Sequence, residues 1–197
     1  ASPAAWLRVR GHKVMCLDLS REALDEAAIR AAGLIAFYVP MHTATRLAAG
    51  LIALVRDMIP RAHLCFYGLY APVNEEYLRG LGVGTILGGE FEEGLANLAE
   101  RLKNTLDAPQ MLSFRAERGI PLGSSDRGIP RSARNDGTLQ EEPVISLARQ
   151  KFLVPDRAGM PQLANYARVV MPGGERRIAG STEATRGCKH LCRHCPI

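Results

Sequence analysis

The chain has 197 residues, of which 47% are hydrophobic and 23% are charged, so it is long enough for one ordinary domain and part of a second. Its formal net charge of +5 is modest and only 6% of its residues are aromatic, which argues against a basic stacking platform and gives no specific nucleic-acid signal. No apolar run reaches the roughly 18 residues of a membrane span, and the N-terminus lacks a secretory pattern. We therefore expect a cytoplasmic protein without membrane contact.

The first hundred residues alternate between apolar runs of strand length and amphipathic stretches of helix length. In chain order, the pattern predicts a helix through Trp6 and Leu7, a buried strand at 14–17, a helix at 21–32, a strand at 34–39, a helix from about 43 to 59, a strand at 63–67, a helix through 77–81, a strand at 85–87 and a helix from about 91 to 106. Ser20 is expected to cap the second helix and Gly33 to end it. This alternation predicts a doubly wound parallel α/β sheet, which we assign to a domain over residues 1–108.

Ligands of such sheets bind at the carboxyl ends of the strands. Three loops follow predicted strands at that edge, at 40–43, 68–72 and 88–90. Glycine in such a loop lets a ligand approach the backbone closely, although it also serves ordinary tight turns. The candidate ligand-facing residues are His42, Thr43, Gly68, Gly88, Gly89 and Glu90. A lone loop histidine such as His42 is more often a helix-capping or surface residue.

Residues 109–143 differ in composition from the predicted domain. Glycine, serine, arginine and proline replace the periodic apolar residues, and Arg-Gly-Ile-Pro at 118–121 recurs at 127–130. The repeat has too little hydrophobic content to form a structural unit, so we predict a flexible, low-complexity linker.

Residues 144–197 end in the motif Cys188-x-x-x-Cys192-x-x-Cys195. Thiolates are soft ligands, and a short loop can direct three of them to three corners of a 4Fe4S cluster. An electron-transfer ferredoxin normally supplies a fourth thiolate. Three closely spaced cysteines therefore indicate a cluster whose fourth iron binds another molecule.

Other uses of the cysteines fit the sequence less well. Zinc would need a fourth ligand such as His190 or His194, whose positions between the cysteines would crowd a tetrahedral ion. Disulfides between such close neighbours would be strained. Cys16 and Cys65 lie in apolar stretches and are expected to be core thiols.

The cysteine motif resembles that of the radical S-adenosylmethionine (SAM) superfamily. The resemblance implies that the open iron chelates SAM and that an electron from the cluster cleaves it to a 5'-deoxyadenosyl radical. His194 stands where many members of the superfamily have an aromatic residue, and it keeps a planar ring there. A strand at 177–185, turned by Arg186 and Gly187 into the cysteine loop, would be the first strand of the catalytic barrel.

The preceding residues resemble a cobalamin-binding domain attached to such enzymes. Residues 88–92, Gly-Gly-Glu-Phe-Glu, are similar to a Gly-Glu-Gly-Glu segment near the end of those domains, and residues 152–157 and 163–166 resemble the bridging segment that follows them. The resemblance implies that the candidate loops face cobalamin, unless the domain binds nothing or another ligand. The first strand of that domain is missing here, together with the Asp-x-His-x-x-Gly motif that would follow it.

Together these features predict a fragment of a radical SAM enzyme, comprising a cobalamin-binding-like (flavodoxin-like) α/β domain, a linker and the opening of a truncated barrel. Thr185–Cys188 and Cys192–Pro196 are similar to an uncharacterised subgroup named for a CUAEP or CCAEP tail. The resemblance implies an unidentified small-molecule or peptide substrate, an electron donor such as flavodoxin or ferredoxin, and, if cobalamin binds, methyl transfer. The fragment alone is expected to be inactive. The alternative is an iron-sulfur electron-transfer or ligand-binding module without radical chemistry.

Overall fold

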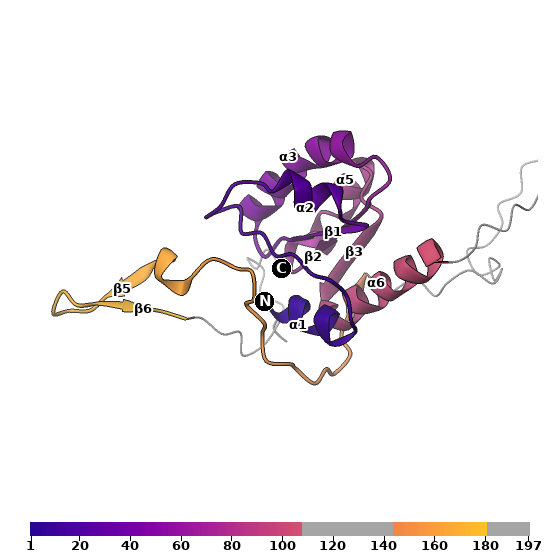
Figure 1. The fold of residues 1–197 in the computed structure, drawn as a ribbon. Coiled ribbons are helices and arrows are strands. Elements are labelled where there is room, and N and C mark those ends of the chain that lie inside the picture. Colours follow the sequence, from indigo (N-terminus) through magenta and orange to yellow (C-terminus); the bar gives the residue numbers. More distant parts are fainter. Residues whose placement is uncertain (108–143, 181–197) are drawn as a thin grey trace, which may run out of the picture.

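The computed structural model describes residues 1–107 and 144–180, and a parallel sheet lies at its centre (Figure 1). Its four strands stand in the order β1-β2-β3-β4. They are β1 Leu34–Tyr38, β2 His63–Tyr67, β3 Thr85–Gly89 and β4 Ile145–Ser146. All neighbours pair in parallel, and the register joins Tyr38 to Tyr67 and Gly89 to Ser146. The predicted α/β class with a parallel sheet is confirmed.

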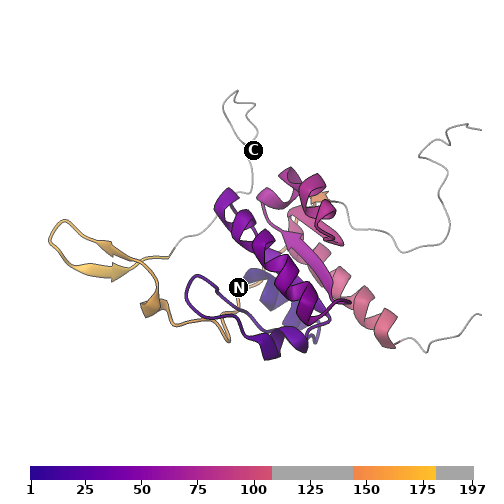
Figure 2. The same ribbon diagram turned by 90° about the horizontal axis from the view of Figure 1, so that it is seen from above.

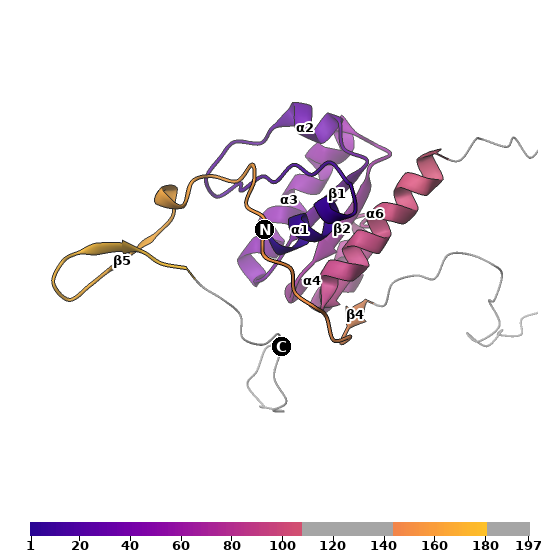
Figure 3. The same cartoon turned by 60° about the horizontal axis from the view of Figure 1, so that its bottom comes forward.

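Helices cover both faces of the sheet. They are α1 Ser2–Val9, α2 Glu26–Arg30, α3 His42–Met58, α4 Tyr70–Val73, α5 Glu75–Gly80 and α6 Phe91–Asp107. One core contains buried side chains of α2, α3, α4 and α5, and the other contains those of α6 with Leu7 of α1. Figure 3 shows α1 and α6 together on one side of the sheet. None of the helices in the described part of the chain is both long and apolar enough to cross a membrane.

The best-predicted elements are those with the clearest apolar pattern. Leu64, Cys65 and Phe66 of β2 are fully buried, as expected for a central parallel strand covered on both faces. In α3, the buried residues are spaced by three or four positions, at Thr45, Ala48, Ile52 and Val55, so one stripe of the helix packs against the sheet. The predicted bounds of β2 are confirmed, and those of α3 and α6 agree within one residue at each end.

The predicted strand at 14–17 is wrong. Residues 13–17 run without regular secondary structure and, within the described ranges, make no backbone-to-backbone hydrogen bonds. Met15 is 60% exposed. Apolar composition alone does not make a strand, because its N–H and C=O groups need a neighbouring strand to pair with.

The predicted helix at 21–32 is also wrong in length, since α2 spans only Glu26–Arg30. Its N-cap is Asp25, whose side chain accepts a hydrogen bond from the Ala28 N–H. Ser20, the predicted cap, instead donates its hydroxyl to Asp18 at 2.6 Å. This local hydrogen bond competes with the start of a helix.

Two further elements differ from the prediction. The helix α4 was missed, because Pro72 and the preceding Gly68 indicated a loop. The strand predicted at 177–185 begins as β6, Arg176–Ile178, which pairs antiparallel with β5, Arg168–Val170, in a hairpin. Residues 181–185 and the predicted linker at 109–143 lie outside the described residues, so the barrel assignment stays a prediction.

Side chains of residues 156–166 attach the C-terminal segment to the N-terminal part of the chain. Arg8 forms an ion pair of 2.7 Å with Asp156 and donates to the carbonyls of Ala158 and Val14. The Tyr166 hydroxyl donates to Asp18 at 2.6 Å. We call this group, with the two arginines that flank it, the clasp: Arg8, Asp18, Arg21, Asp156, Arg157 and Tyr166.

The clasp combines hydrogen bonds with cation–π contacts. The guanidinium carbons of Arg21 and Arg157 lie 5.5 and 5.4 Å from the centre of the Tyr166 ring, within the range of such contacts. Partial burial raises the pKa of Asp18, but the hydrogen bonds from Ser20 and Tyr166 outweigh it and leave the pKa below its usual value. The clasp therefore holds Asp18 as a carboxylate at neutral pH.

We predict that Tyr166→Phe loosens the contact between residues 12–18 and 156–166, because it removes the hydroxyl that Asp18 accepts. The hydrogen-bonded backbone amides of His12, Asn165 and Tyr166 should exchange hydrogen about tenfold faster or more, as expected for losing one hydrogen bond to a charged group. Tyr77→Phe is the control, since Tyr77 is 58% exposed on α5. Equal protection in the two variants would contradict the role given to Tyr166.

The Asp18 contact should also depend on pH. Its pKa is lower in the folded chain than the value of about 3.9 expected when unfolded. The stabilisation is therefore fully present above about pH 4 and is lost as the pH falls through the folded-state pKa. Protection factors of the hydrogen-bonded amides of His12 and Tyr166 should fall in that range in the natural chain, and less in Tyr166→Phe.

Candidate functional site

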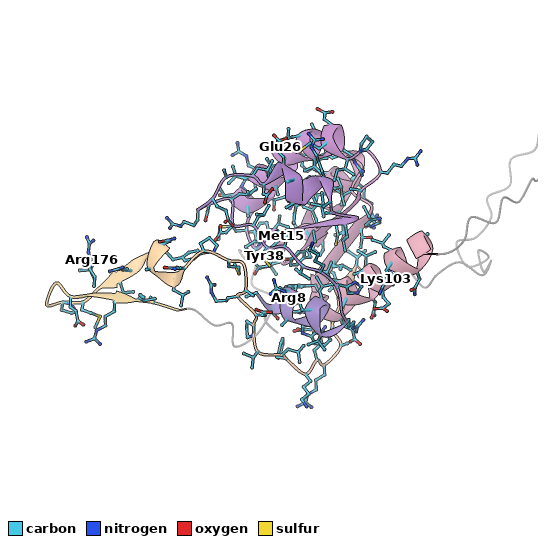
Figure 4. All side chains as sticks on the ribbon, viewed as in Figure 1. Arg8, Met15, Glu26, Tyr38, Lys103 and Arg176 are labelled. Atoms are coloured by element: carbon cyan, nitrogen blue, oxygen red, sulfur yellow. The ribbon has the colours of Figure 1, made fainter. Side chains whose placement is uncertain are left out.

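The carboxyl edge of the sheet carries an aromatic cluster that the sequence analysis missed. Tyr38 ends β1, Tyr67 ends β2 and Phe91 begins α6. The ring of Tyr67 lies 5.4 Å from that of Tyr38 and 5.1 Å from that of Phe91. Figure 4 labels Tyr38 at this place. Aromatic residues directly at strand ends were the available signal, because parallel strand ends meet at one edge.

Most of this cluster is removed from solvent. Burial raises the pKa of the Tyr67 hydroxyl above its usual value, so Tyr67 stays protonated at neutral pH. Tyr38 is 47% exposed. The cluster therefore offers an apolar wall with one accessible edge at Tyr38.

The glycines predicted to face a ligand instead lie against other parts of the chain. Gly68 has φ of +112°, and a Cβ there would lie 3.1 Å from the Tyr38 ring. A Cβ on Gly88 would overlap Pro72, and one on Gly89, whose φ is +64°, would overlap the Ser146 carbonyl oxygen. The clearance that these glycines provide is taken by Tyr38, α4 and β4.

The backbone of β4 closes the edge beside β3. The Gly88 N–H donates to the Val144 carbonyl at 2.6 Å, and the Glu90 N–H donates to the Ser146 carbonyl at 2.8 Å. The Gln150 side-chain amide then donates to the Glu90 carbonyl at 2.7 Å. The chain itself thus binds backbone groups that an external ligand would use.

The remaining candidate residues occupy different positions. Gly68 and Gly88 are brought together across neighbouring strands, since the Gly68 N–H donates to the Leu87 carbonyl at 3.0 Å. His42 and Thr43 begin α3 and are exposed. The N-cap of α3 is Met41, without a side-chain capping bond, so His42 does not cap that helix.

Small hollows lie at this edge. A cavity of about 170 Å³ lies between the end of β3, the first turns of α6 and Ser146. A groove of about 420 Å³ adjoins it, with Glu90, Ser146 and Ala148 lining both. Pockets for drug-sized ligands measure about 300–1,000 Å³, and a corrin ring with its substituents is larger than such ligands. The described residues therefore do not fit cobalamin in this arrangement.

Glu92 is a fully buried carboxyl group near this edge. It lies in the first turn of α6, and its Oε1 accepts a hydrogen bond of 2.9 Å from the Ser2 hydroxyl of α1. A carboxylate is favourable at the N-terminus of a helix. Glu92 thereby joins α1 to α6 beneath the sheet.

The two described cysteines differ in burial. Cys65 is fully buried in β2, and burial raises its pKa above the usual range, so it stays a protonated thiol as predicted for the core. Cys16 lies among residues 13–17, is only partly buried and belongs to neither core, so the prediction that it is a core thiol is wrong. Among residues 1–107 and 144–180, no group of three or more His, Cys, Asp or Glu side chains could hold a metal ion. Cys188, Cys192 and Cys195 lie outside the described residues, and their role stays a prediction.

Comparison with protein-family models, with curated proteins and with solved structures finds no match to this chain. The geometry of the chain and its cysteine motif therefore carry the functional argument.

We predict that the chain does not bind cobalamin, because its own atoms fill the space beside Gly68, Gly88 and Gly89. Titration of the chain with hydroxocobalamin should leave the visible spectrum of the corrinoid unchanged, and equilibrium dialysis should retain none with the protein. Stoichiometric retention would overturn this prediction and show that β4 can leave the edge.

We further predict that Gly88→Ala destabilises the fold, because its methyl group would overlap Pro72, whose ring cannot move aside. Overpacking of this kind typically costs about 1–3 kcal/mol. Gly50→Ala is the matched control, since nothing lies within 4 Å of the added Cβ in the middle of α3. The control should stabilise the chain by about 0.5–1 kcal/mol. Urea unfolding measures both changes, and a neutral Gly88→Ala would contradict the packing role.

Proposed function

We propose that the chain is part of a radical SAM enzyme in which Cys188, Cys192 and Cys195 ligate a 4Fe4S cluster. The observation that carries the proposal is the spacing of these residues, CxxxCxxC, which supplies three thiolates and no fourth. Thiolates are suited to iron-sulfur clusters, and three leave one iron open for SAM. When bound, the cluster supplies the electron that cleaves SAM to a 5'-deoxyadenosyl radical.

Basic residues next to the motif cysteines in the sequence favour the thiolate form that binds iron. Lys189 and Arg193 stand next to cysteines in the sequence. Nearby cations lower the pKa of a thiol and so favour the thiolate that binds iron. Cys65, in contrast, is buried without a cation and stays protonated. Cys65 is therefore not expected to ligate iron.

The α/β unit acts in this proposal as a scaffold for the chain that leads to the motif. Residues 144–166 return across the sheet edge and the clasp, and β6 ends at Ile178, ten residues before Cys188. Because the sheet edge does not fit cobalamin, the proposed chemistry includes no cobalamin-dependent methyl transfer. A cytoplasmic setting belongs to the same proposal, since such clusters need a reducing environment.

We predict that the chain, reconstituted anaerobically with iron and sulfide, binds about four irons and four sulfides through the three motif cysteines. In the protein that carries this chain together with the rest of the barrel, the reduced electron paramagnetic resonance spectrum should change when SAM is added, because SAM binds the open iron. Cys188→Ala, Cys192→Ala and Cys195→Ala should each lower the bound iron by more than half. Cys16→Ala is the control and should retain the cluster.

The outcomes separate the alternatives. A cluster whose spectrum ignores SAM would favour the electron-transfer or ligand-binding module. Zinc bound in place of a cluster would overturn the proposal. Equal iron loss in the Cys16→Ala control would show that the measurement reports folding rather than ligation.

A further inference from the structure

Positive charge is distributed unevenly along the described chain. Residues 144–180 contain six lysines and arginines against two acidic residues, whereas residues 1–107 contain eleven against twelve. Both acidic residues of the later range are already paired, Asp156 with Arg8 and Glu175 with Arg177. The excess of positive charge therefore lies on the segment that leads to the cysteines.

The β5-β6 hairpin presents part of this charge on one face. In the antiparallel register, Arg168 stands opposite Ile178 and Val170 stands opposite Arg176. Opposite residues share a face, and alternate pairs lie on the same side. We call this surface the hairpin face: Arg168, Val170, Arg176 and Ile178.

The hairpin face is open to solvent. Val170 is 61% and Ile178 is 55% exposed, and both arginines are exposed. Within the described ranges, neither Arg168 nor Arg176 has a carboxylate at ion-pair distance. Two unneutralised cations on one side of a ribbon repel each other and favour an anionic partner.

The hairpin projects from the α/β unit and has little support of its own. Figures 1 and 2 show β5 and β6 extending away from the helices and the sheet, and Figure 4 places Arg176 near the end of the projection. An isolated two-stranded hairpin is marginally stable in water. A surface that covers Val170 and Ile178 and supplies carboxylates would stabilise it through apolar burial and bidentate contacts with arginine.

We propose that the hairpin face is the docking surface for a small acidic protein that delivers an electron to the cluster. This inference rests on the proposed function. One electron leaves the redox group of the partner, which is oxidised by one equivalent, and enters the cluster, which is reduced by one equivalent. The step forms and breaks no covalent bond.

Two observations favour an acidic redox protein over a nucleic acid. Apolar side chains alternate with the arginines on the hairpin face, as in protein interfaces, where arginine is enriched. From Ala167 to Ile178 the hairpin has no aromatic residue on which a base could stack. The position along the chain is compatible with this role, since Cys188 comes ten positions after Ile178 and the two residues lie at most about 35 Å apart.

The test compares two variants with the same change in charge. Arg168→Glu with Arg176→Glu reverses the hairpin face, whereas Arg46→Glu with Arg61→Glu reverses two exposed arginines of the α/β unit. Stopped-flow spectroscopy measures reduction of the reconstituted cluster by reduced flavodoxin, an acidic probe, at low and high salt. Dithionite, which needs no docking surface, measures the intrinsic reducibility of each cluster.

At low salt, the hairpin variant should be reduced by flavodoxin about 10–100-fold more slowly than the natural chain, because electrostatic steering raises association rates by such factors. The control should change by less than about threefold, and salt should narrow the difference. Dithionite should reduce all three clusters equally. Arg168→Gln with Arg176→Gln, which only neutralises the face, should give an intermediate rate.

Equal rates of reduction by flavodoxin in the hairpin variant and the control would overturn the docking proposal. The proposed function would still stand in that case if SAM changes the spectrum of the cluster. Loss of binding to single-stranded RNA in the hairpin variant, with unchanged flavodoxin rates, would also overturn it in favour of a nucleic-acid surface. Failure of the natural chain to form a cluster would instead refute the proposed function, and electron delivery with it.

Discussion

The pairing of β4 with the carboxyl end of β3 is the constraint on which the later part of the structure depends. Only two residues, Ile145 and Ser146, form the strand, yet they return the chain to the sheet after residue 143. Gly88 and Gly89 make this possible because side chains there would overlap Pro72 and Ser146. From this fixed point the segment runs past α6 to the clasp and then to the hairpin (Figure 3). A short backbone ladder thus sets the direction of the chain that leads to the cysteines.

The clasp attaches the N-terminal segment to the rest of the fold, as hydrogen bonds between strands do for β1 to β4. Residues 13–17 make no strand pairing within the described part, so side chains from residues 156–166 hold the N-terminal segment instead. Exposed ion pairs contribute about 0–1 kcal/mol each, much less than the burial of a core side chain. The attachment therefore depends on several weak contacts acting together, and the stacking of Arg21 and Arg157 on Tyr166 adds to it. Such an attachment holds residues 156–166 against the N-terminal segment while costing little free energy to release.

How far the sequence predicts this structure depends on where the decisive contacts lie. The apolar patterns of β2, α3 and α6 are local and long enough to define these elements. The failure at 14–17 arose because strand formation needs a distant partner, and α2 is short because Asp18 binds Ser20 locally. For Gly88 and Gly89, the sequence predicted close approach correctly but could not identify what approaches. Pro72 of α4 lies against Gly88, and β4 lies against Gly89. The strand β4 comes more than fifty residues later, and its two-residue length gives no readable pattern.

The carboxyl edge of the sheet is closed by β4, whereas the hairpin face is open. A partner molecule is therefore more easily accepted at the hairpin than at the sheet. Parallel sheets commonly bind ligands at the carboxyl edge, but here backbone groups of Gly88 and Glu90 already bond to residues 144 and 146. Removing β4 to admit a large cofactor would leave those groups to find new partners, which is unfavourable if they stay buried. The hairpin carries no such penalty, because its arginines and valines face water and gain partners on docking. This difference in the cost of binding favours the α/β unit as a scaffold and residues 168–178 as the surface where another molecule binds.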